Sequence, residues 1–169
     1  GSAYYAANPV FPLRQTVAAL NMDALSWGGP TRDVSVIGFG ASELEEYLAA
    51  AAKTQDRVLR EEPTPEKGFF YRSDHFNFAK GGVPALYIKL GVDDREKGEE
   101  WGRAQLAEFT KNDYHKPSDE FRPGIDVRGG LQDIELMQRI GWRLANERRF
   151  PNWYPDSEFR AARDRSLAR

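Results

Sequence analysis

The sequence contains no cysteine, which excludes disulfide bonds and thiolate metal sites. Any metal ion must therefore be bound by carboxylates and by the two histidines, His75 and His115. The chain also lacks a strong net charge, because 24 basic residues balance 26 acidic ones. It has no apolar run of bilayer length and no apolar signal segment at its start. We therefore expect neither a nucleic-acid partner nor a membrane partner.

The length of 169 residues suits one domain, with residues 150–169 as a tail that wraps the surface and then frays. Apolar or alternating runs predict four strands, which begin near residues 15, 33, 58 and 85. The first is almost continuously apolar through Met22, as in a strand buried on both faces. Helical patterns separate the strands. This alternation predicts an α/β fold with a mixed or largely parallel sheet.

Two helices are predicted from apolar residues three and four positions apart. The first begins at Ser42, where Ser42 and Glu45 have the spacing of a capping box. The second follows Val127 and has a predicted apolar stripe of Leu131, Ile134, Met137, Ile140, Leu144 and Ala145. Residues 101–109 fit either a short helix or a loop. Residues 91–100 are charged without an apolar period, and we expect an exposed loop there.

The most informative stretch is 69–90, where ionisable side chains precede a predicted strand. Arg72, Ser73, Asp74 and His75 supply a cation, a hydroxyl, a carboxylate and an imidazole in consecutive positions. Chemistry is often placed on a loop that a rigid element holds in position. A structural interpretation is equally supported by this stretch alone: Asp74 caps a helical turn, and Arg72 pairs with a surface carboxylate.

Asp23 closes the first apolar strand, where a carboxylate is costly to bury unless it is paired or bound to a metal. It could equally form a turn before Gly28. His115 lies in a polar turn before a proline, and both histidines are expected on polar loops. Ligands of α/β sheets collect at the carboxyl ends of strands. Asp23, the 72–75 segment and His115 are therefore expected to converge on one edge of the sheet.

Three motifs, LNMD, YRSDHFNFAKGGVPAL and YHKPSDE, occur in an order and at separations that resemble the C-terminal half of the catalytic domain of family-twenty-eight metallopeptidases. These are di-zinc exopeptidases, including secreted aminopeptidases and glutamate carboxypeptidases, with the related glutaminyl cyclases. The resemblance implies a three-layer α/β sandwich that is incomplete in this chain. It also implies a peptide substrate and export to the periplasm or the cell exterior.

The resemblance implies metal ligands as well. Asp23, in the position of the N-x-D carboxylate, would bind one zinc ion, and His115, in the Y-H-x-P-x-D motif, would bind the other. Asp119 or Asn21 would support these ligands through hydrogen bonds. Zinc, as two ions in the complete domain, is therefore the expected cofactor.

The resemblance places one further segment beside the substrate. Its members would be Tyr71, Arg72, Ser73, Asp74 and His75. Within it, His75 or Tyr71 would donate a hydrogen bond to the oxyanion that develops during hydrolysis.

The motifs for the family's upstream His, bridging Asp and Glu-Glu pair are absent. The segment from Gly1 to Tyr5 resembles the stretch that follows that pair, so the general base is expected upstream and Gly1-Ser2 would be native sequence. With one ligand for each zinc ion, the chain alone should bind zinc weakly or not at all and hydrolyse nothing. An incomplete sheet should also leave an open edge that can pair with another chain. Two alternatives stay open: a non-catalytic binding module on the peptidase fold, and a glutaminyl cyclase-like enzyme.

Overall fold

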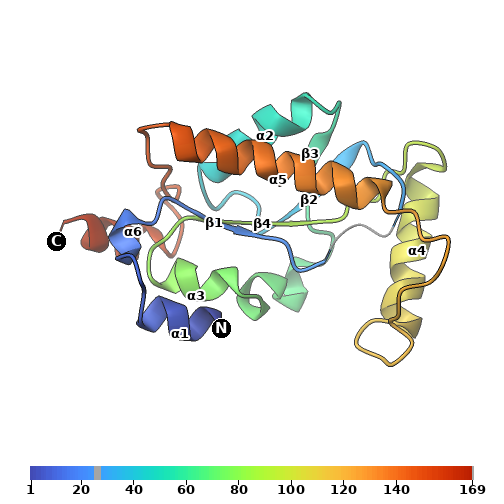
Figure 1. Ribbon diagram of the computed structural model, residues 1–169, viewed down its shortest axis with the longest axis horizontal. Helices are drawn as coiled ribbons and strands as arrows, with labels where there is room; N and C mark the ends of the chain where they lie inside the picture. Colours follow the sequence, from blue (N-terminus) through green and yellow to red (C-terminus); the bar gives the residue numbers. More distant parts are fainter. Residues whose placement is uncertain (25–27, 169) are drawn as a thin grey trace.

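The computed structural model describes residues 1–24 and 28–168 and contains a four-stranded sheet with helices on both faces (Figure 1). The strands are β1 (Ala19–Asn21), β2 (Asp33–Ile37), β3 (Val58–Glu61) and β4 (Ala85–Lys89), in the order β1-β4-β2-β3. β1 pairs with β4 and β2 with β3 in parallel, whereas β2 and β4 are antiparallel. The expected α/β fold with a mixed, largely parallel sheet in three layers is confirmed.

One face of the sheet is covered by α2 (Leu44–Lys53) and α5 (Arg128–Asn146), which Figure 1 shows above the strands. The core on this face is largely aliphatic, because alternate strand residues meet the apolar stripes of both helices. Its fully buried members are Val34, Val36, Leu44, Tyr47, Leu48, Ala52, Leu86, Ile88, Leu136, Met137, Ile140 and Leu144.

The helix expected after Val127 is present, but part of its predicted stripe is wrong. Leu131, Ile134 and Ala145 are exposed, whereas Leu136, outside the predicted stripe, is fully buried. The helix packs against α2 as well as against the sheet, so its buried face is turned toward Leu136 and Met137. A sequence period gives the width of such a face but does not fix its exact orientation.

The expected capping box at the start of α2 forms only by half. The Glu45 carboxylate accepts the backbone N–H of Ser42 at 3.4 Å, and also those of Gly40 and Ala41 at 3.0 and 2.8 Å. The Ser42 hydroxyl, however, donates to the Ala85 carbonyl oxygen, and the helix begins at Leu44. Ser42 therefore ties the helix start to β4 in place of capping it.

The opposite face is covered by α1 (Ser2–Ala7) and α3 (His75–Lys80), drawn below the strands in Figure 1. A 3₁₀ turn, Phe69–Arg72, precedes α3, and similar turns occupy Leu13–Gln15 and Pro65–Lys67. The core here is mainly aromatic. Its buried members are Ile37, Phe70, Ala79, Ala85, Tyr87, Trp153 and Phe159.

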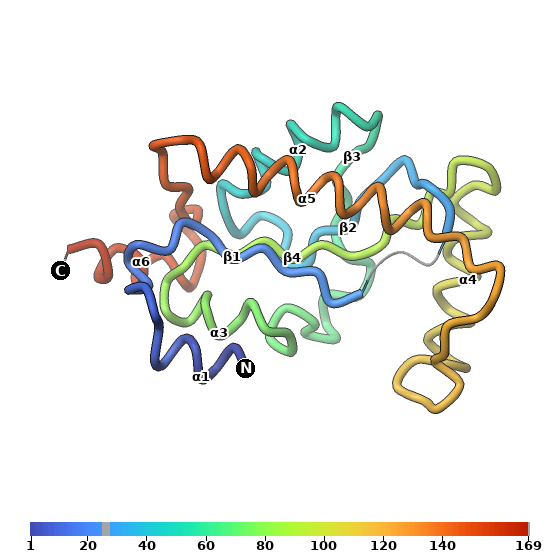
Figure 2. Tube along the Cα trace, viewed as in Figure 1, coloured from blue at the N-terminus to red at the C-terminus, as the bar shows by residue number. Residues whose placement is uncertain are grey.

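The expectation of a fraying surface tail is wrong. Trp153 is completely buried, and its indole N–H donates to the Gly82 carbonyl oxygen at 3.0 Å. Beyond it, the chain forms α6 (Arg160–Leu167). Figure 2 shows α6 beside the segment that leads into β1, and Arg163 donates to the carbonyl oxygens of Leu13 and Thr16 there. The segment thus belongs to the aromatic core.

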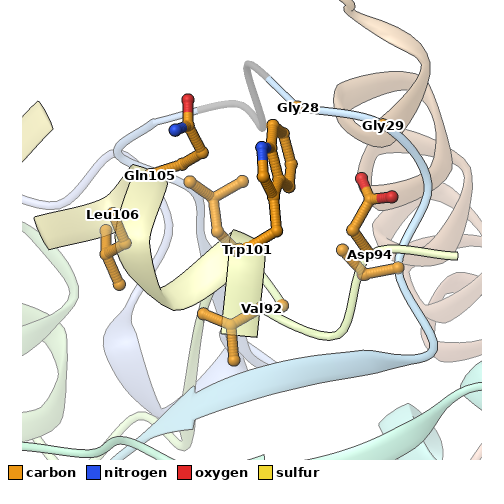
Figure 3. A pocket seen from close by; sticks show the side chains of 11 residues that line it. Gly28, Gly29, Val92, Asp94, Trp101, Gln105 and Leu106 are labelled. Atoms are coloured by element: carbon orange, nitrogen blue, oxygen red, sulfur yellow. The ribbon is translucent and has the colours of Figure 1, made fainter. Parts of the chain in front are cut away.

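The exposed loop expected over 91–100 is also corrected, because Val92 and Asp94 are buried and α4 (Gly98–Asn112) begins within it. The Asp94 carboxylate accepts the backbone N–H groups of Glu96 and Lys97, both at 2.8 Å. Figure 3 shows Trp101 and Asp94 around a cavity of about 30 Å³, room for about one water molecule. Charges in this segment therefore organise a helix start.

The first strand is shorter than expected and is not buried on both faces. All three residues of β1 are only half-buried, because β1 lies at the edge of the sheet. None of the described helices is long and apolar enough to cross a membrane.

Candidate active site

Asp23 lies two residues beyond β1, and side chains from three segments hold its carboxylate. The Ser73 hydroxyl is 2.7 and 2.8 Å from the two carboxylate oxygens, and the Tyr87 hydroxyl donates to Oδ2 at 2.8 Å. The Asn21 amide donates to Oδ1 at 3.0 Å and to the Ser73 hydroxyl oxygen at 2.9 Å. Because Asn21 lies opposite Tyr87 in the register of β1 and β4, the sheet itself brings these donors together.

These hydrogen bonds set the charge of the site. Burial alone would raise the pKa of Asp23, but the hydrogen bonds from Ser73, Tyr87 and Asn21 outweigh it, and the pKa lies below its usual value. Burial and the bond to Asp23 raise the pKa of Tyr87 far above its usual value. At neutral pH, Asp23 is therefore an oriented anion, and Tyr87 keeps its proton.

An open pocket of about 580 Å³ lies beside this carboxylate. Its lining combines polar, charged and aromatic side chains, namely Asp23, Tyr71, Arg72, Ser73, Asp74, Phe76, Asn77 and Lys80. Four of the five residues for which the resemblance implies substrate contact thus share one pocket with Asp23. The pocket has the volume of a small-ligand site.

His75 is the exception, and the expectation that it lies on a polar loop is wrong. It is the first residue of α3 and is 2% exposed. Its ring contacts Phe70 edge-on at 4.5 Å between centroids and lies 4.9 Å from the Tyr87 ring. Neither ring nitrogen has a hydrogen-bond partner among the described residues, and burial lowers the His75 pKa to about 4. His75 therefore packs neutral beneath the pocket.

The structural role considered for Asp74 is not the one observed. Asp74 precedes α3, but its side chain makes no capping hydrogen bond. Its carboxylate accepts instead from the Ser2 hydroxyl, which also accepts from Asn77. Tyr71 is exposed and donates to Glu158 at 2.8 Å. The rim of the pocket thus joins segments from the beginning, middle and end of the chain.

His115 lies on the exposed segment that follows α4. This segment and α4 lie at one end of the molecule (Figure 1). Its φ of 58° is uncommon for a residue other than glycine, and its ring stacks on Tyr114 at 3.9 Å. Burial and the interactions with Asp23 are the larger causes of the raised pKa of Tyr87. The charge of Tyr114 is a smaller cause that acts in the same direction. Tyr114 therefore lies within electrostatic reach of the Asp23 site.

The described residues do not by themselves fit a complete zinc site. Nowhere in residues 1–24 and 28–168 do three or more His, Asp or Glu side chains gather closely enough to hold an ion. Asp23 offers carboxylate oxygens that already accept from three donors. A zinc ion ordinarily takes three or four protein ligands.

Tyr87 is the site residue that sequence reasoning missed. It stands inside the apolar run of β4, where no pattern distinguishes it from its neighbours, and it is 3% exposed. The pairing of LNMD with ALYIK as neighbouring strands could have placed it opposite Asn21, but pairing is a tertiary property.

An oriented carboxylate beside an open polar pocket at a strand end is where the ligands of α/β folds bind. The sequence model of Peptidase family M28 matches residues 1–134, and the chain belongs to that family. Members of this family are peptidases that generally depend on zinc. No curated protein and no solved structure matches the chain.

Proposed function

We propose that this chain forms part of a zinc-dependent exopeptidase of the aminopeptidase type, and that the peptide binds in the pocket beside Asp23. One observation carries the proposal. The Asp23 carboxylate is ionised, is oriented by three hydrogen-bond donors and faces an open pocket. Membership of Peptidase family M28 supports a peptide as the ligand.

The proposal assigns roles to the chain's own residues. Asp23 supplies a fixed anion, and Ser73 and Tyr87 prevent it from turning away. Of the two candidates for a donor to the oxyanion, Tyr71 is favoured over His75, because Tyr71 is exposed at the pocket while both nitrogens of His75 are buried. To donate, the Tyr71 hydroxyl would have to exchange its hydrogen bond to Glu158 for one to the oxyanion. Arg72 adds a cation to the same wall.

Zinc binding is proposed through Asp23 for one ion and His115 for the other. Because the described residues gather no third ligand, the remaining ligands and the general base are proposed to come from an upstream segment. The chain alone should then bind zinc weakly and hydrolyse nothing. Export from the cell is proposed from the resemblance to secreted relatives.

The test compares zinc content and hydrolysis of chromogenic aminoacyl substrates for this chain and for a version extended upstream through a Glu-Glu motif. The extended protein should bind about two zinc ions and cleave, while the chain alone does neither. Asp23→Ala and His115→Ala should each abolish cleavage in the extended protein. Glu108→Ala, at an exposed position of α4, serves as the control. An extended protein that binds no metal would contradict the peptidase proposal.

A non-catalytic binding module is the second candidate, and the free edge of β1 favours it. Residues 16–22 carry no charge, whereas the other edge strand, β3, contains Arg60 and Glu61. Charged residues on an edge strand discourage pairing with other chains, and β1 has none. We propose that this edge can pair with another chain, including a second copy. Sedimentation analysis tests this: the unaltered chain should self-associate and Leu20→Lys should not. The proposal is contradicted if both proteins are monomers.

A further inference from the structure

One side of α5 stays exposed although it is largely apolar. Leu131, Ile134 and Trp142 on this side are 61%, 40% and 68% exposed. The full set recurs every three or four residues, which places it along one side of the helix, and consists of Leu131, Ile134, Gln138, Trp142 and Ala145. The charged residues of α5 occupy other positions, namely Arg128, Asp133, Glu135, Arg139 and Arg143. An uncharged row of this kind, here called the α5 row, indicates a surface that another element covers.

The α5 row faces away from α2 and toward the edge of the sheet. α2 lies on the other side of α5, where the Arg143 guanidinium is 4.3 Å from the centroid of the Tyr47 ring. Arg143 follows Ile134 by nine residues, which is half a turn out of phase in an α-helix. Gly141 follows Ile134 by seven residues, about two full turns, and a Cβ atom placed on Gly141 would lie 3.7 Å from Cδ1 of Leu20 in β1. The α5 row therefore runs along β1.

β1 itself is incomplete on its outer side. It ends the sheet, and no strand within residues 1–24 and 28–168 pairs with it there. Its backbone N–H and C=O groups on that side are available to another strand. Met22, directly after β1, is 39% exposed, and residues 16–22 carry no charge. A free strand edge and an uncovered helix row thus lie side by side on one flank of the molecule.

A second copy of this chain would cover both features at once. A two-fold axis perpendicular to the sheet pairs β1 antiparallel with its counterpart and leaves both α5 helices on the same face of the continued sheet. Gly141 of α5 lies next to Leu20 of β1. Ile140 shares a core with Leu86 and Ile88 of β4, so α5 covers both strands. With strands about 4.8 Å apart, the two α5 helices would lie roughly 10 Å apart, which is the distance between packed helices.

Charge favours the same occupant. Neither residues 16–22 nor the α5 row carries a charge, so neither repels its own copy, and the formal net charge of -2 opposes association only slightly. We propose that two copies of this chain form a symmetric dimer, in which β1 pairs with β1 and the two α5 rows pack against each other. The inference rests on the edge pairing proposed above and deepens it, because it names the second copy as the occupant and α5 as the helix that holds it.

Sedimentation equilibrium of the unaltered chain tests the dimer. The contact surface consists of one short strand and one side of a helix, so it is small for a specific interface, and we expect a dissociation constant on the order of 10 µM. The chain should sediment as a monomer at about 1 µM and as a dimer at about 200 µM. Association should stop at the dimer, because a two-fold contact is closed.

Variants of α5 separate this inference from strand pairing alone. Trp142→Lys and Ile134→Lys each place a charge in the α5 row against its own copy, and each should raise the dissociation constant by at least about 30-fold. Leu20→Lys should also weaken the dimer, through the strand edge. Phe121→Lys, at an 80% exposed position after α4, is the matched control and should leave the dissociation constant unchanged. Circular dichroism confirms that each variant is folded.

Three results would overturn the inference: a monomer at about 200 µM, association that continues beyond the dimer, or a dimer that neither α5 variant weakens. A dimer that only Leu20→Lys dissociates keeps the edge pairing proposed above and refutes the contact between the α5 rows. The peptidase proposal is tested separately, since it is judged by zinc content and cleavage in the extended protein.

Discussion

Among the described residues, the core on the face under α2 and α5 has twelve buried members and the core on the opposite face has seven, and the two cores differ in chemistry. The face under α2 and α5 is aliphatic, and its buried charges pair: Arg57 binds Asp133 and also donates to the Thr31 hydroxyl. The face under α3 is aromatic and keeps a neutral histidine, His75, without hydrogen-bond partners among the described residues. The pocket beside Asp23 lies on the aromatic side.

The difference separates scaffold from site. A face whose buried charges are paired has little capacity left for a ligand, whereas unsatisfied groups carry an energetic cost that a ligand can relieve. Packing on the aliphatic face therefore helps to fix the positions of β1 and β4. On the aromatic face, Tyr87 of β4 then lies where it can donate to Asp23, just beyond β1.

The largest expected effect is on the aliphatic face. Arg57→Met leaves Asp133 as an unpaired buried carboxylate and should lower the free energy of unfolding by about 3–5 kcal/mol, measured with urea. Burial already raises the pKa of Asp133 despite Arg57, so Arg57→Met with Asp133→Leu should recover more than half of the loss. Glu135→Ala breaks an exposed pair with Arg139, which water screens, and should cost far less than Arg57→Met. Equal losses of stability in Arg57→Met and Glu135→Ala would show that the buried ion pair matters no more than the exposed one.

The next effect belongs to the aromatic face and depends on pH. The pKa of His75 is about 4 in the folded protein and 6.5 ordinarily, so the unfolded chain takes up a proton that the folded protein refuses. Stability should therefore fall as pH drops from 6.5 to 4, by up to about 3 kcal/mol from this group. His75→Leu should remove this part of the pH dependence. Identical pH profiles for the variant and the unaltered chain would show that His75 is not held neutral.

A smaller effect is expected at the carboxylate itself. Tyr87→Phe removes one donor to Asp23 and should cost about 1 kcal/mol, because Asp23 is exposed to water and can replace the bond. The pKa of Asp23, followed by carbon NMR, should rise toward its ordinary value. Tyr47→Phe, which removes a similar bond to Glu147 on the other face, should leave the Asp23 pKa unchanged. No rise in Tyr87→Phe would contradict the assigned network.

The smallest effect tests the orientation of α5. Leu131→Gln changes a residue that is 61% exposed and should alter the free energy of unfolding by no more than about 0.5 kcal/mol. Leu136→Ala, at a completely buried position five residues later, should cost about 2–5 kcal/mol. If chemical denaturation instead showed a larger loss of stability for Leu131→Gln than for Leu136→Ala, the apolar stripe expected from the sequence would be correct.

Much of the sheet could be predicted because local pattern determined it. β2, β3 and β4 occupy the runs expected near residues 33, 58 and 85, where short runs rich in apolar residues are bounded by turn residues. The half-buried state of β1 could not be predicted, since the position of a strand within a sheet is set by partners distant in sequence. The burial of Trp153 could not be predicted either, because a single tryptophan among prolines forms no periodic pattern.

The candidate site was predictable in part. Asp23 and the residues from Tyr71 to Asp74 were singled out as ionisable or polar groups beside predicted strands, and they line one pocket. The sequence could not show that His75 turns inward, because the first residue of a short helix can face either way.

Arg163 gives the end of the chain an unexpected influence on the pocket. Its buried guanidinium donates to the carbonyl oxygens of Leu13 and Thr16, just before β1, and no carboxylate pairs with it among the described residues. Its backbone packs so closely on Gly82 that a side chain there would collide with it. Proteolytic trimming before Arg163 would therefore act at a distance: it would release the lead-in to β1 and, with it, the strand that holds Asp23 in register.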